Sequence, residues 1–154
     1  MSEHSSRIEW MRGDSPFSDD SYTRGHRWVL DGGIDVPASS APGIPNAVEA
    51  AIDPEEGVLS SLSSCHMLFF LALAMRKNFI VDAYTDRPSG VIDRNAAGKK
   101  AFVTITMRPE ATFSGDTLPT REDIDALHAR AHSLCFVANS LNAEITIESV
   151  YPAE

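Results

Sequence analysis

The feature of this sequence that most constrains its fold is a clear helix start followed by a long apolar run. Asp53 is a good helix N-cap, Pro54 suits the first helical position, and Glu56 stands three residues past the cap, as in a capping box. The run from Met67 to Met75 is apolar on all sides, which is typical of a helix buried on every side. We therefore predict one helix over residues 53–77, with a partner subunit or a sheet wrapped around its second half.

Composition and the start of the chain exclude several classes of partner. The apolar run covers nine residues, whereas a membrane span needs about 20, so we expect no membrane partner. The formal net charge is −9 and the nearest approach to a basic cluster is Lys99–Lys100, which argues against nucleic acid. The N-terminus, MSEHSSRIEW, lacks the pattern of a signal peptide. Two cysteines without an export signal predict a reducing compartment, and hence a cytoplasmic protein.

The remainder of the chain is predicted to form strands and one further helix. Thr120 caps the second helix, Asp123 completes its capping box, and an apolar stripe extends it over residues 118–141. Alternation and turn residues, among them DGG at 31–33, predict strands over residues 7–13, 21–36, 79–92, 100–113 and 143–151. Length and element order predict a single α+β domain, residues 1–154, without regular alternation of strand and helix.

Each of the two predicted helices contains one cysteine. Buried free cysteines are ordinarily inert core residues, but polar residues surround both Cys65 and Cys135, which favours working thiols. Cys65 lies roughly three turns inside its helix, and the helix dipole fades within the first turn. A thiolate there needs an external cation, and an arginine stays charged when partly buried. We select Arg24, which alternation places on one strand face with His26.

A metal site is the competing use of the second cysteine. His128, His132 and Cys135 stand at i, i+4 and i+7, hence on one helix face, and Cys65 with His66 would complete a zinc site. Adjacent residues on a helix, however, point about 100° apart, and none of the compact zinc spacings occurs. We therefore expect no metal, and zinc is the minor alternative.

These segments resemble one known family. The helix DPEEGVLSSLSSCHMLFFLALA, the second helix AHSLCFVANS and the upstream DGGIDVPASSAP resemble the OsmC/Ohr family of thiol-dependent hydroperoxide reductases. The resemblance spans about residue 20 to 150. Its most specific elements are Pro-Glu about three turns ahead of the first cysteine and a second helical cysteine. It implies an α+β fold with antiparallel sheets and two long helices, the first buried centrally, in an intertwined homodimer with active sites at the subunit interface.

The resemblance implies a role for each candidate residue. Cys65 is the thiolate that attacks the O–O bond of an alkyl or lipid hydroperoxide, and Cys135 resolves the resulting sulfenic acid to a disulfide. Glu55, ten residues before Cys65, matches the family's glutamate that pairs with the activating arginine. That arginine is Arg24, with Arg27 as the open alternative. The implied reductant is a dithiol or a lipoyl group, and no cofactor such as flavin, haem or selenium is needed.

Two positions depart from the better-known organic hydroperoxide reductases. Those proteins usually carry an aromatic residue after the first cysteine and proline after the second, whereas this chain has His66 and Phe136. Both departures adjoin a redox position, so the reductant, the substrate and the role of His66 stay open. The alternative function is a non-catalytic OsmC-like dimer whose cleft binds a small apolar or thiol-reactive ligand while both cysteines stay reduced.

Overall fold

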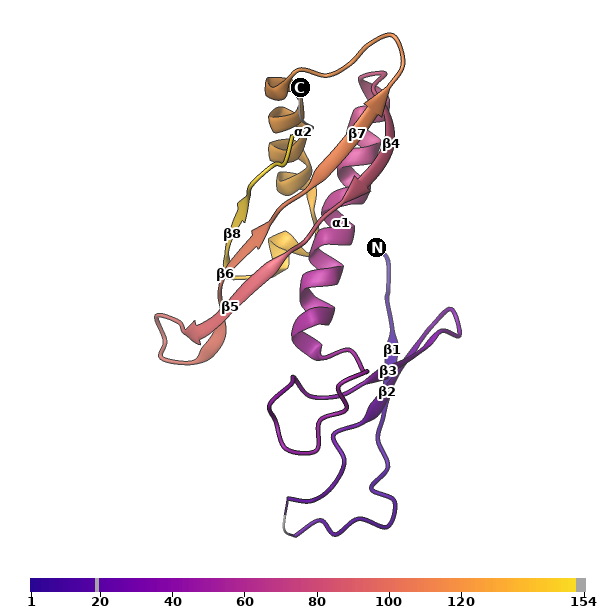
Figure 1. Cartoon of the computed structure of the whole chain (residues 1–154), viewed down its shortest axis with the longest axis vertical. Helices are drawn as coiled ribbons and strands as arrows, with labels where there is room; N and C mark the ends of the chain where they lie inside the picture. Colours follow the sequence, from indigo (N-terminus) through magenta and orange to yellow (C-terminus); the bar gives the residue numbers. More distant parts are fainter. Residues whose placement is uncertain (19, 152–154) are drawn as a thin grey trace. The chain divides into compact units, whose positions relative to one another are not determined.

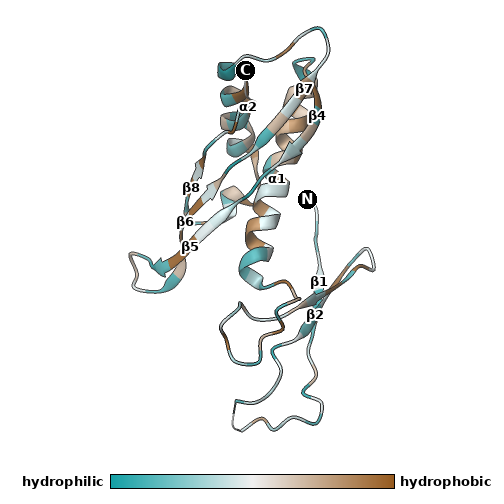
Figure 2. Cartoon of the chain, in the orientation of Figure 1, coloured by the Kyte–Doolittle hydropathy of each residue, from teal (hydrophilic) through white to brown (hydrophobic). Residues whose placement is uncertain are grey.

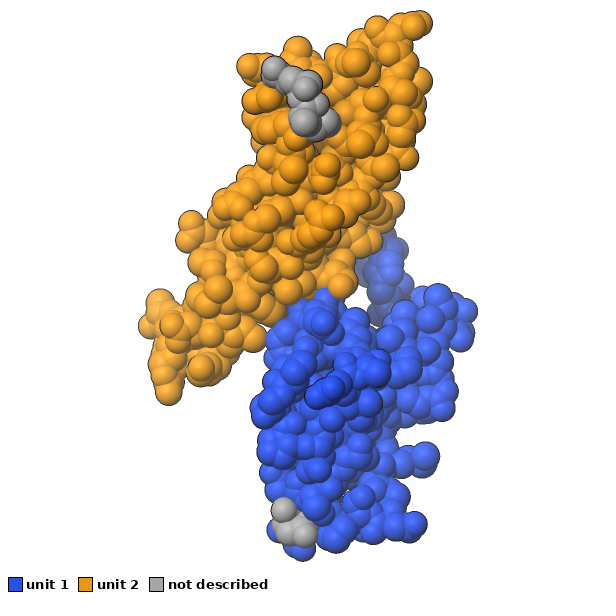
Figure 3. Space-filling model, viewed as in Figure 1, with its two compact units in different colours: residues 1–58 blue, residues 59–154 orange. Residues whose placement is uncertain are grey.

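The computed structural model describes residues 1–18 and 20–151. Its elements follow the predicted order of strands, helix, strands, helix, strand (Figure 1). The chain divides into two compact units, the first unit (residues 1–58) and the second unit (residues 59–154), coloured separately in Figure 3. The prediction that residues 1–154 form a single domain stays a prediction.

The first unit is built on a three-stranded antiparallel sheet. Its strands are β1 (Ser6–Glu9), β2 (His26–Leu30) and β3 (Asp35–Ala38), in the order β1-β2-β3. The predicted DGG turn joins β2 to β3. Gly33 has a φ of +79°, a conformation that favours glycine, and Leu30 N–H donates to Ile34 O at 2.9 Å.

The strand predicted from residue 21 begins only at His26. Gly25 N–H donates to Thr23 Oγ1 at 3.0 Å, and Arg24 N–H donates to Asn46 O at 3.1 Å. These bonds turn the chain ahead of β2, because a short hydroxyl side chain offers the backbone an alternative to a strand ladder. Arg24 therefore lies in a loop, and the prediction that it shares a strand face with His26 was wrong.

Helix α1 (Pro54–Arg76) begins where the capping box predicts. Glu56 N–H donates to Asp53 Oδ1 at 2.7 Å, and Asp53 N–H donates to the Glu56 carboxylate at 3.1 Å. Both side chains therefore satisfy backbone groups that a helix start leaves unpaired. Gly57 lies against Trp28, where an added Cβ would stand 2.5 Å from the indole ring. Any larger residue at this position would push the indole away.

The second unit contains two small sheets (Figure 1). In one, β4 (Ile80–Thr85) pairs antiparallel with β7 (Glu110–Ser114). In the other, β6 (Lys100–Met107) pairs antiparallel with β5 (Ser89–Arg94) and parallel with β8 (Glu144–Ile147). The sheets are therefore antiparallel except where the last strand joins.

The strands predicted over 79–92 and 100–113 are each two strands. Each break contains a proline, which lacks the N–H that a ladder needs. Asp86 lies in the first break, and its carboxylate accepts hydrogen bonds from Ser63 Oγ on α1 and from Arg108 N–H in the second break, both at 2.6 Å. This one carboxylate therefore ties both breaks to α1.

Two apolar clusters form the core of the second unit. The first joins α1, α2 (Arg121–Leu134) and β7, and its buried members are Phe70, Ala74, Phe79, Ala111, Ile124, Leu127 and Ala131. The second joins α1, β6 and the segment after α2, and its buried members are Leu62, Ile105, Met107, Cys135 and Ala138. Because α1 contributes to both clusters, it is the central element of this core, as predicted.

Within the single chain, α1 is buried along one stripe and not on every side. The buried residues, spaced four apart, are Leu62, His66, Phe70 and Ala74. Outside the stripe, Leu68 and Met75 are 61% and 65% exposed, and Figure 2 shows further apolar colour along the helix. By length and composition α1 would suffice to cross a membrane. Its buried stripe packs into both clusters, which is the pattern of a core helix.

Helix α2 begins as predicted but ends earlier. Thr120 and Asp123 form the predicted capping box. The last helical residue is Leu134, not residue 141. Cys135 is the C-cap, with φ −66° and ψ 115°, so the prediction that it lies inside the helix was wrong.

Polar side chains explain the early end of α2. Asn139 Nδ2 donates to Ser133 O at 3.3 Å, and Ser140 Oγ donates to Phe136 O at 2.8 Å. These bonds serve carbonyls that a continuing helix would pair with backbone N–H groups. A short 3-10 helix, η1 (Ala138–Ser140), follows.

Candidate functional site

The structure brings the two cysteine thiols together within the second unit. Cys65, on α1, is half-buried, whereas Cys135, at the end of α2, is fully buried, and both are free. Cys65 packs against the apolar cluster to which Cys135 belongs, and its thiol is a neighbour of the Cys135 thiol. The Cys135 Sγ accepts the N–H of Ala138 at 3.4 Å and lies 4.0 Å from Leu62 O. The sequence left open whether these two thiols approach each other, and in the structure they do.

The surroundings of Cys135 keep its thiol protonated. Burial raises the pKa of Cys135 to about 11; the N–H of Ala138 opposes this shift, and the neighbouring Cys65 thiol reinforces it. The two thiols are therefore unequal. Cys65 is accessible to small molecules, as a first nucleophile must be, whereas Cys135 lies in the protein interior.

Cys65 opens onto an apolar pocket of about 490 Å³ beside α1. The pocket is lined by Ser61, Ser64, Cys65, Leu68, Phe69, Ala72 and Phe136. Phe136 follows Cys135 directly, is 73% exposed, and packs edge-to-face on Phe69 with ring centroids 5.2 Å apart. A small molecule with an apolar body fits this lining, since such pockets combine apolar walls with few polar groups.

His66 points away from this pocket and into the core. It is fully buried, and its Nε2 lies 2.9 Å from Nδ1 of His128 on α2. The two rings are within 10° of parallel, and His128 also stacks on Phe70 at 4.4 Å. Burial lowers the pKa of both histidines to about 4. Both rings are therefore neutral near pH 7, and one ring nitrogen donates to the other.

Further polar groups surround this histidine pair. His132 and Asp86 are close enough to influence the charge of His66, the first lowering its pKa and the second raising it. Burial, reinforced by Asp86, raises the pKa of Tyr84. His128 and His132 also line a second pocket, of about 480 Å³, together with Asp125 and Tyr151. His66, His128 and Tyr84 are therefore neutral polar side chains packed beside the helix that carries Cys65.

The alternative zinc arrangement is not formed. Among residues 1–18 and 20–151, no three His, Cys, Asp or Glu side chains converge so as to hold a metal ion. His128 Nδ1 faces His66, whereas Cys135 Sγ faces Leu62 O and the N–H of Ala138. The shared helix face on which that alternative relied is lost because α2 ends before Cys135.

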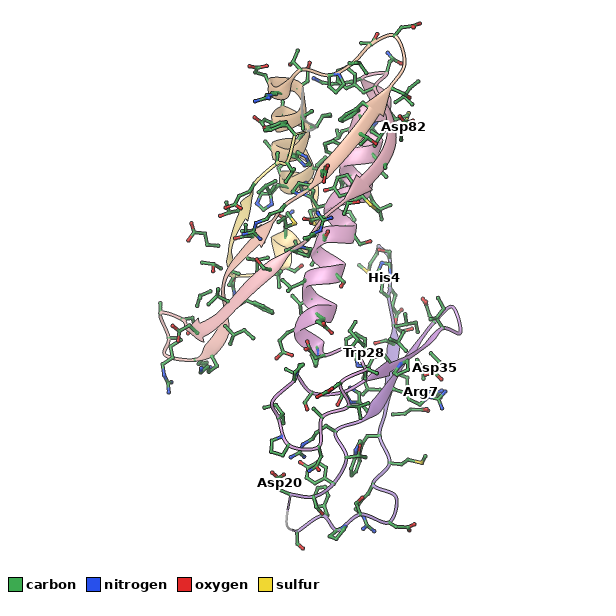
Figure 4. All side chains as sticks on the ribbon, viewed as in Figure 1. His4, Arg7, Asp20, Trp28, Asp35 and Asp82 are labelled. Carbon is green, nitrogen blue, oxygen red and sulfur yellow. The ribbon has the colours of Figure 1, made fainter. Side chains whose placement is uncertain are left out.

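The two candidate arginines lie in the first unit and differ in their surroundings. The Arg24 side chain is only 15% exposed, pairs with Asp20, and lies 3.8 Å above the centroid of the Tyr22 ring. Arg27 is 62% exposed and pairs with Asp35 on β3. Figure 4 labels both carboxylates, Asp20 in the loop before β2 and Asp35 at the hairpin. Arg24 is the more enclosed of the two cations.

The four predicted site residues divide between the two units. Cys65 and Cys135 meet in the second unit. Arg24 and Glu55 belong to the first, where Glu55 lies half-buried in the opening turn of α1. The roles predicted for Arg24 and Glu55 toward Cys65 stay predictions.

Sequence reasoning missed the pairing of His66 with His128 and the aromatic wall formed by Phe69 and Phe136. The paired histidines are 62 positions apart in the sequence, and no local sequence pattern predicts such a contact. One signal was available for His66. It stands four residues after Leu62 and four before Phe70, which places it on the stripe that α1 buries.

The fold and the paired thiols define a class of protein. In this chain a central helix presents one thiol to an apolar pocket, and a second, buried thiol lies at the end of another helix. The family model described as OsmC-like protein matches residues 47–150. This chain belongs to the OsmC-like family.

Solved structures agree with this assignment. An OsmC-like protein of unknown function from Vibrio cholerae O1 biovar eltor str. N16961 is 42% identical, with a TM-score of 0.95 over 97% of this chain and 100% of that one. An organic hydroperoxide resistance protein from Elizabethkingia anophelis is 14% identical, with a TM-score of 0.72 over 100% and 98% of the two chains. The organic hydroperoxide resistance protein OhrB of Bacillus subtilis is also 14% identical, with a TM-score of 0.67 over 97% and 98%. No curated protein matches the chain. The predicted family and fold class are confirmed.

Proposed function

We propose that this chain reduces organic hydroperoxides in the cytoplasm through a cycle of Cys65 and Cys135, and that it acts as a homodimer. The observation that carries the proposal is the placement of Cys65, which faces an apolar pocket on one side and neighbours the buried Cys135 on the other. Membership of the OsmC-like family supports it, because two structural neighbours are organic hydroperoxide resistance proteins.

In the proposed cycle the two thiols carry the bond changes and an external dithiol supplies the electrons. The Cys65 thiolate attacks the outer oxygen of an alkyl or lipid hydroperoxide, so that an S–O bond forms, the O–O bond breaks, and the alkoxide leaves as an alcohol after taking a proton. Cys135 then loses its proton and attacks the sulfur of the Cys65 sulfenic acid. An S–S bond forms and the oxygen leaves as water. A dithiol or dihydrolipoyl reductant restores both thiols by exchange and is itself oxidised to a disulfide.

We assign the activation of Cys65 to Arg24, with Glu55 as the carboxylate that orients the arginine. Arg24 is preferred to Arg27 because it is the more enclosed cation, and a guanidinium stays charged when desolvated. A charge-preserving Arg24→Lys change should slow Cys65 oxidation, because an ammonium cannot reproduce the planar fork of the guanidinium. The same change at Arg27 is the matched control and should leave the rate unaltered.

The direct test mixes the reduced protein with cumene hydroperoxide or tert-butyl hydroperoxide. Free thiols are counted and the intact mass is measured after each addition. The proposal expects both thiols to disappear together with the loss of two hydrogens, and it expects Cys65→Ser to abolish peroxide consumption. Unchanged thiols in the wild-type protein, or a fully active Cys65→Ser variant, would refute it.

A non-catalytic role is the second candidate, favoured by the buried, protonated state of Cys135. In that role the 490 Å³ pocket binds a small apolar or thiol-reactive ligand and both cysteines stay reduced. Two measurements together distinguish the catalytic role from the binding role. One is a calorimetric titration with 2-phenyl-2-propanol, the alcohol formed from cumene hydroperoxide, and the other is the peroxide turnover. Saturable binding together with no peroxide turnover would favour the binding role.

A further inference from the structure

We infer that the buried hydrogen bond between His66 and His128 positions Cys65 against Cys135 and thereby governs how readily the disulfide closes. The inference rests on the proposed function, whose cycle passes through that disulfide. His66 and His128 are positioning residues in this scheme, because neither contacts a cysteine thiol in any bond described above.

The hydrogen bond between His66 and His128 joins the two helices that carry the cysteines. His66 follows Cys65 in α1 and points about 100° away from it, so that one residue reaches the pocket and the next reaches the core. Its partner, His128, lies in α2, and seven residues later the same helix is capped by Cys135. One bond therefore joins the helix that carries the first thiol to the helix that ends at the second.

This hydrogen bond fixes the position of α1 along α2, which apolar packing alone leaves free to shift. Apolar side chains tolerate small shifts of one helix along another, whereas an N–H···N bond of 2.9 Å is directional. Both rings are buried, so a slip that breaks the bond leaves polar nitrogens without water. Disulfide closure needs this precision, because the Cα atoms of a disulfide lie within about 4.4–6.8 Å and the Cβ atoms must face each other.

The surroundings of His66 decide which ring nitrogen donates the hydrogen bond. His66 Nδ1 is buried and has no hydrogen-bond partner among the described residues. A buried N–H without a partner is the rarer and costlier state, compared with a buried lone pair. His66 therefore carries its proton on Nε2 and donates to Nδ1 of His128. A glutamine at position 66 would present an amide N–H at a similar reach, whereas a phenylalanine would keep the ring and lose the donor.

The experiment measures thiol approach without any hydroperoxide. The reduced protein is equilibrated with mixtures of glutathione and glutathione disulfide. The protein dithiol gives up two hydrogens to form the Cys65–Cys135 disulfide, and one glutathione disulfide becomes two glutathiones. The equilibrium constant, read by thiol alkylation and mass spectrometry, reports the effective concentration of one thiol at the other. Urea unfolding of the same samples reports stability.

The variants are His66→Phe/His128→Phe, in which both partners become apolar, and His66→Gln, which keeps the donor. Removing both partners of a buried hydrogen bond is close to neutral for stability, so we expect the double variant to fold. We expect its disulfide equilibrium constant to fall by about tenfold or more, and we expect His66→Gln to stay nearer to the wild-type value. The His66→Phe single variant should unfold at lower urea than the double variant, because it leaves His128 Nδ1 unpaired.

Two results would overturn the inference. One is a wild-type equilibrium constant in a folded double variant. The other is a loss in His66→Gln as large as in the double variant. Neither result touches the proposed peroxidase activity, and an inactive wild-type protein with a normal glutathione equilibrium would refute the activity while leaving the positioning role intact.

Discussion

Cys135 and Phe136 stand side by side in the sequence and face opposite environments. Cys135 is fully buried with its pKa raised by that burial, whereas Phe136 is 73% exposed on the wall of the pocket that Cys65 faces. The early end of α2 causes this contrast, since the C-cap conformation of Cys135 interrupts the helical spacing. The two residues can therefore be tested separately. A change at Cys135 tests the formation of the disulfide, and a change at Phe136 tests how the hydroperoxide fits the pocket.

The first prediction concerns Cys135→Ser. Serine keeps the size of the side chain but cannot attack a sulfenic acid, so the first oxidation should proceed and the second step should fail. We expect one equivalent of peroxide to be consumed, an oxygen adduct on Cys65 in the intact mass, and no further turnover with a dithiol reductant present in limiting amount. Undiminished steady-state turnover would show that Cys135 is not the resolving thiol.

The second prediction concerns Phe136→Ala. Truncation removes an aromatic wall that packs edge-to-face on Phe69, and such aromatic contacts contribute about 0.5–1.5 kcal/mol beyond their area. We expect kcat/KM for cumene hydroperoxide to fall by about tenfold, and that for tert-butyl hydroperoxide to fall less. Leu118→Ala is the matched control, because Leu118 is exposed to a similar extent (61%) outside the pocket. Equal losses for both substrates would exclude a role for Phe136 in substrate choice.

At the scale of elements, local signals were predictable and distant contacts were not. Both predicted capping boxes are confirmed, Asp53 with Glu56 and Thr120 with Asp123. They could be predicted because the two residues of each box stand only three positions apart. The strand breaks were missed although each contains a proline, a local signal. The Asp86 contacts that hold both breaks were out of reach, because their partners lie about twenty positions away in either direction along the chain. The meeting of His66 with His128 depends on how α1 packs on α2, which periodicity alone cannot give.

The third prediction concerns how stability depends on pH through the histidine pair between α1 and α2. Burial lowers the pKa of His66 and His128 to about 4, against an ordinary value of 6.5. Between those values the unfolded chain binds more protons than the folded one, so stability is present above pH 6.5 and falls as the pH drops toward 4. The loss is on the order of 3 kcal/mol for each histidine. Urea unfolding at a series of pH values measures it.

The control for this dependence is the double variant His66→Phe/His128→Phe. It retains the other groups near the pair, namely His132, Asp86 and Asp125. Its free energy of unfolding should therefore change much less between pH 6.5 and pH 4 than that of the wild-type protein. Parallel pH profiles for the two proteins would show that the buried histidines do not set the acid sensitivity.

At the scale of the whole molecule, the main question is what covers the apolar flank of α1. The sequence predicts burial on every side, and the single chain buries one stripe. Leu68, Phe69 and Phe136 lie around the Cys65 pocket outside that stripe, and Leu68 and Met75 are well exposed. Exposed apolar surface of this kind marks an interaction site. A second copy of the chain is the occupant that the family resemblance implies, with the thiol pocket at the subunit interface.

The fourth prediction tests that arrangement with two matched substitutions. Leu68 and Leu118 are both 61% exposed, but Leu68 lies on the flank of α1 and Leu118 in the loop before α2. A glutamate at position 68 would place a charge in the proposed interface, where desolvation makes it costly. We expect size-exclusion chromatography with light scattering to give twice the chain mass for the wild-type protein and for Leu118→Glu, and the mass of one chain for Leu68→Glu. A monomeric wild-type protein, or a dimer that survives Leu68→Glu, would mean that this flank of α1 is not covered by a second copy.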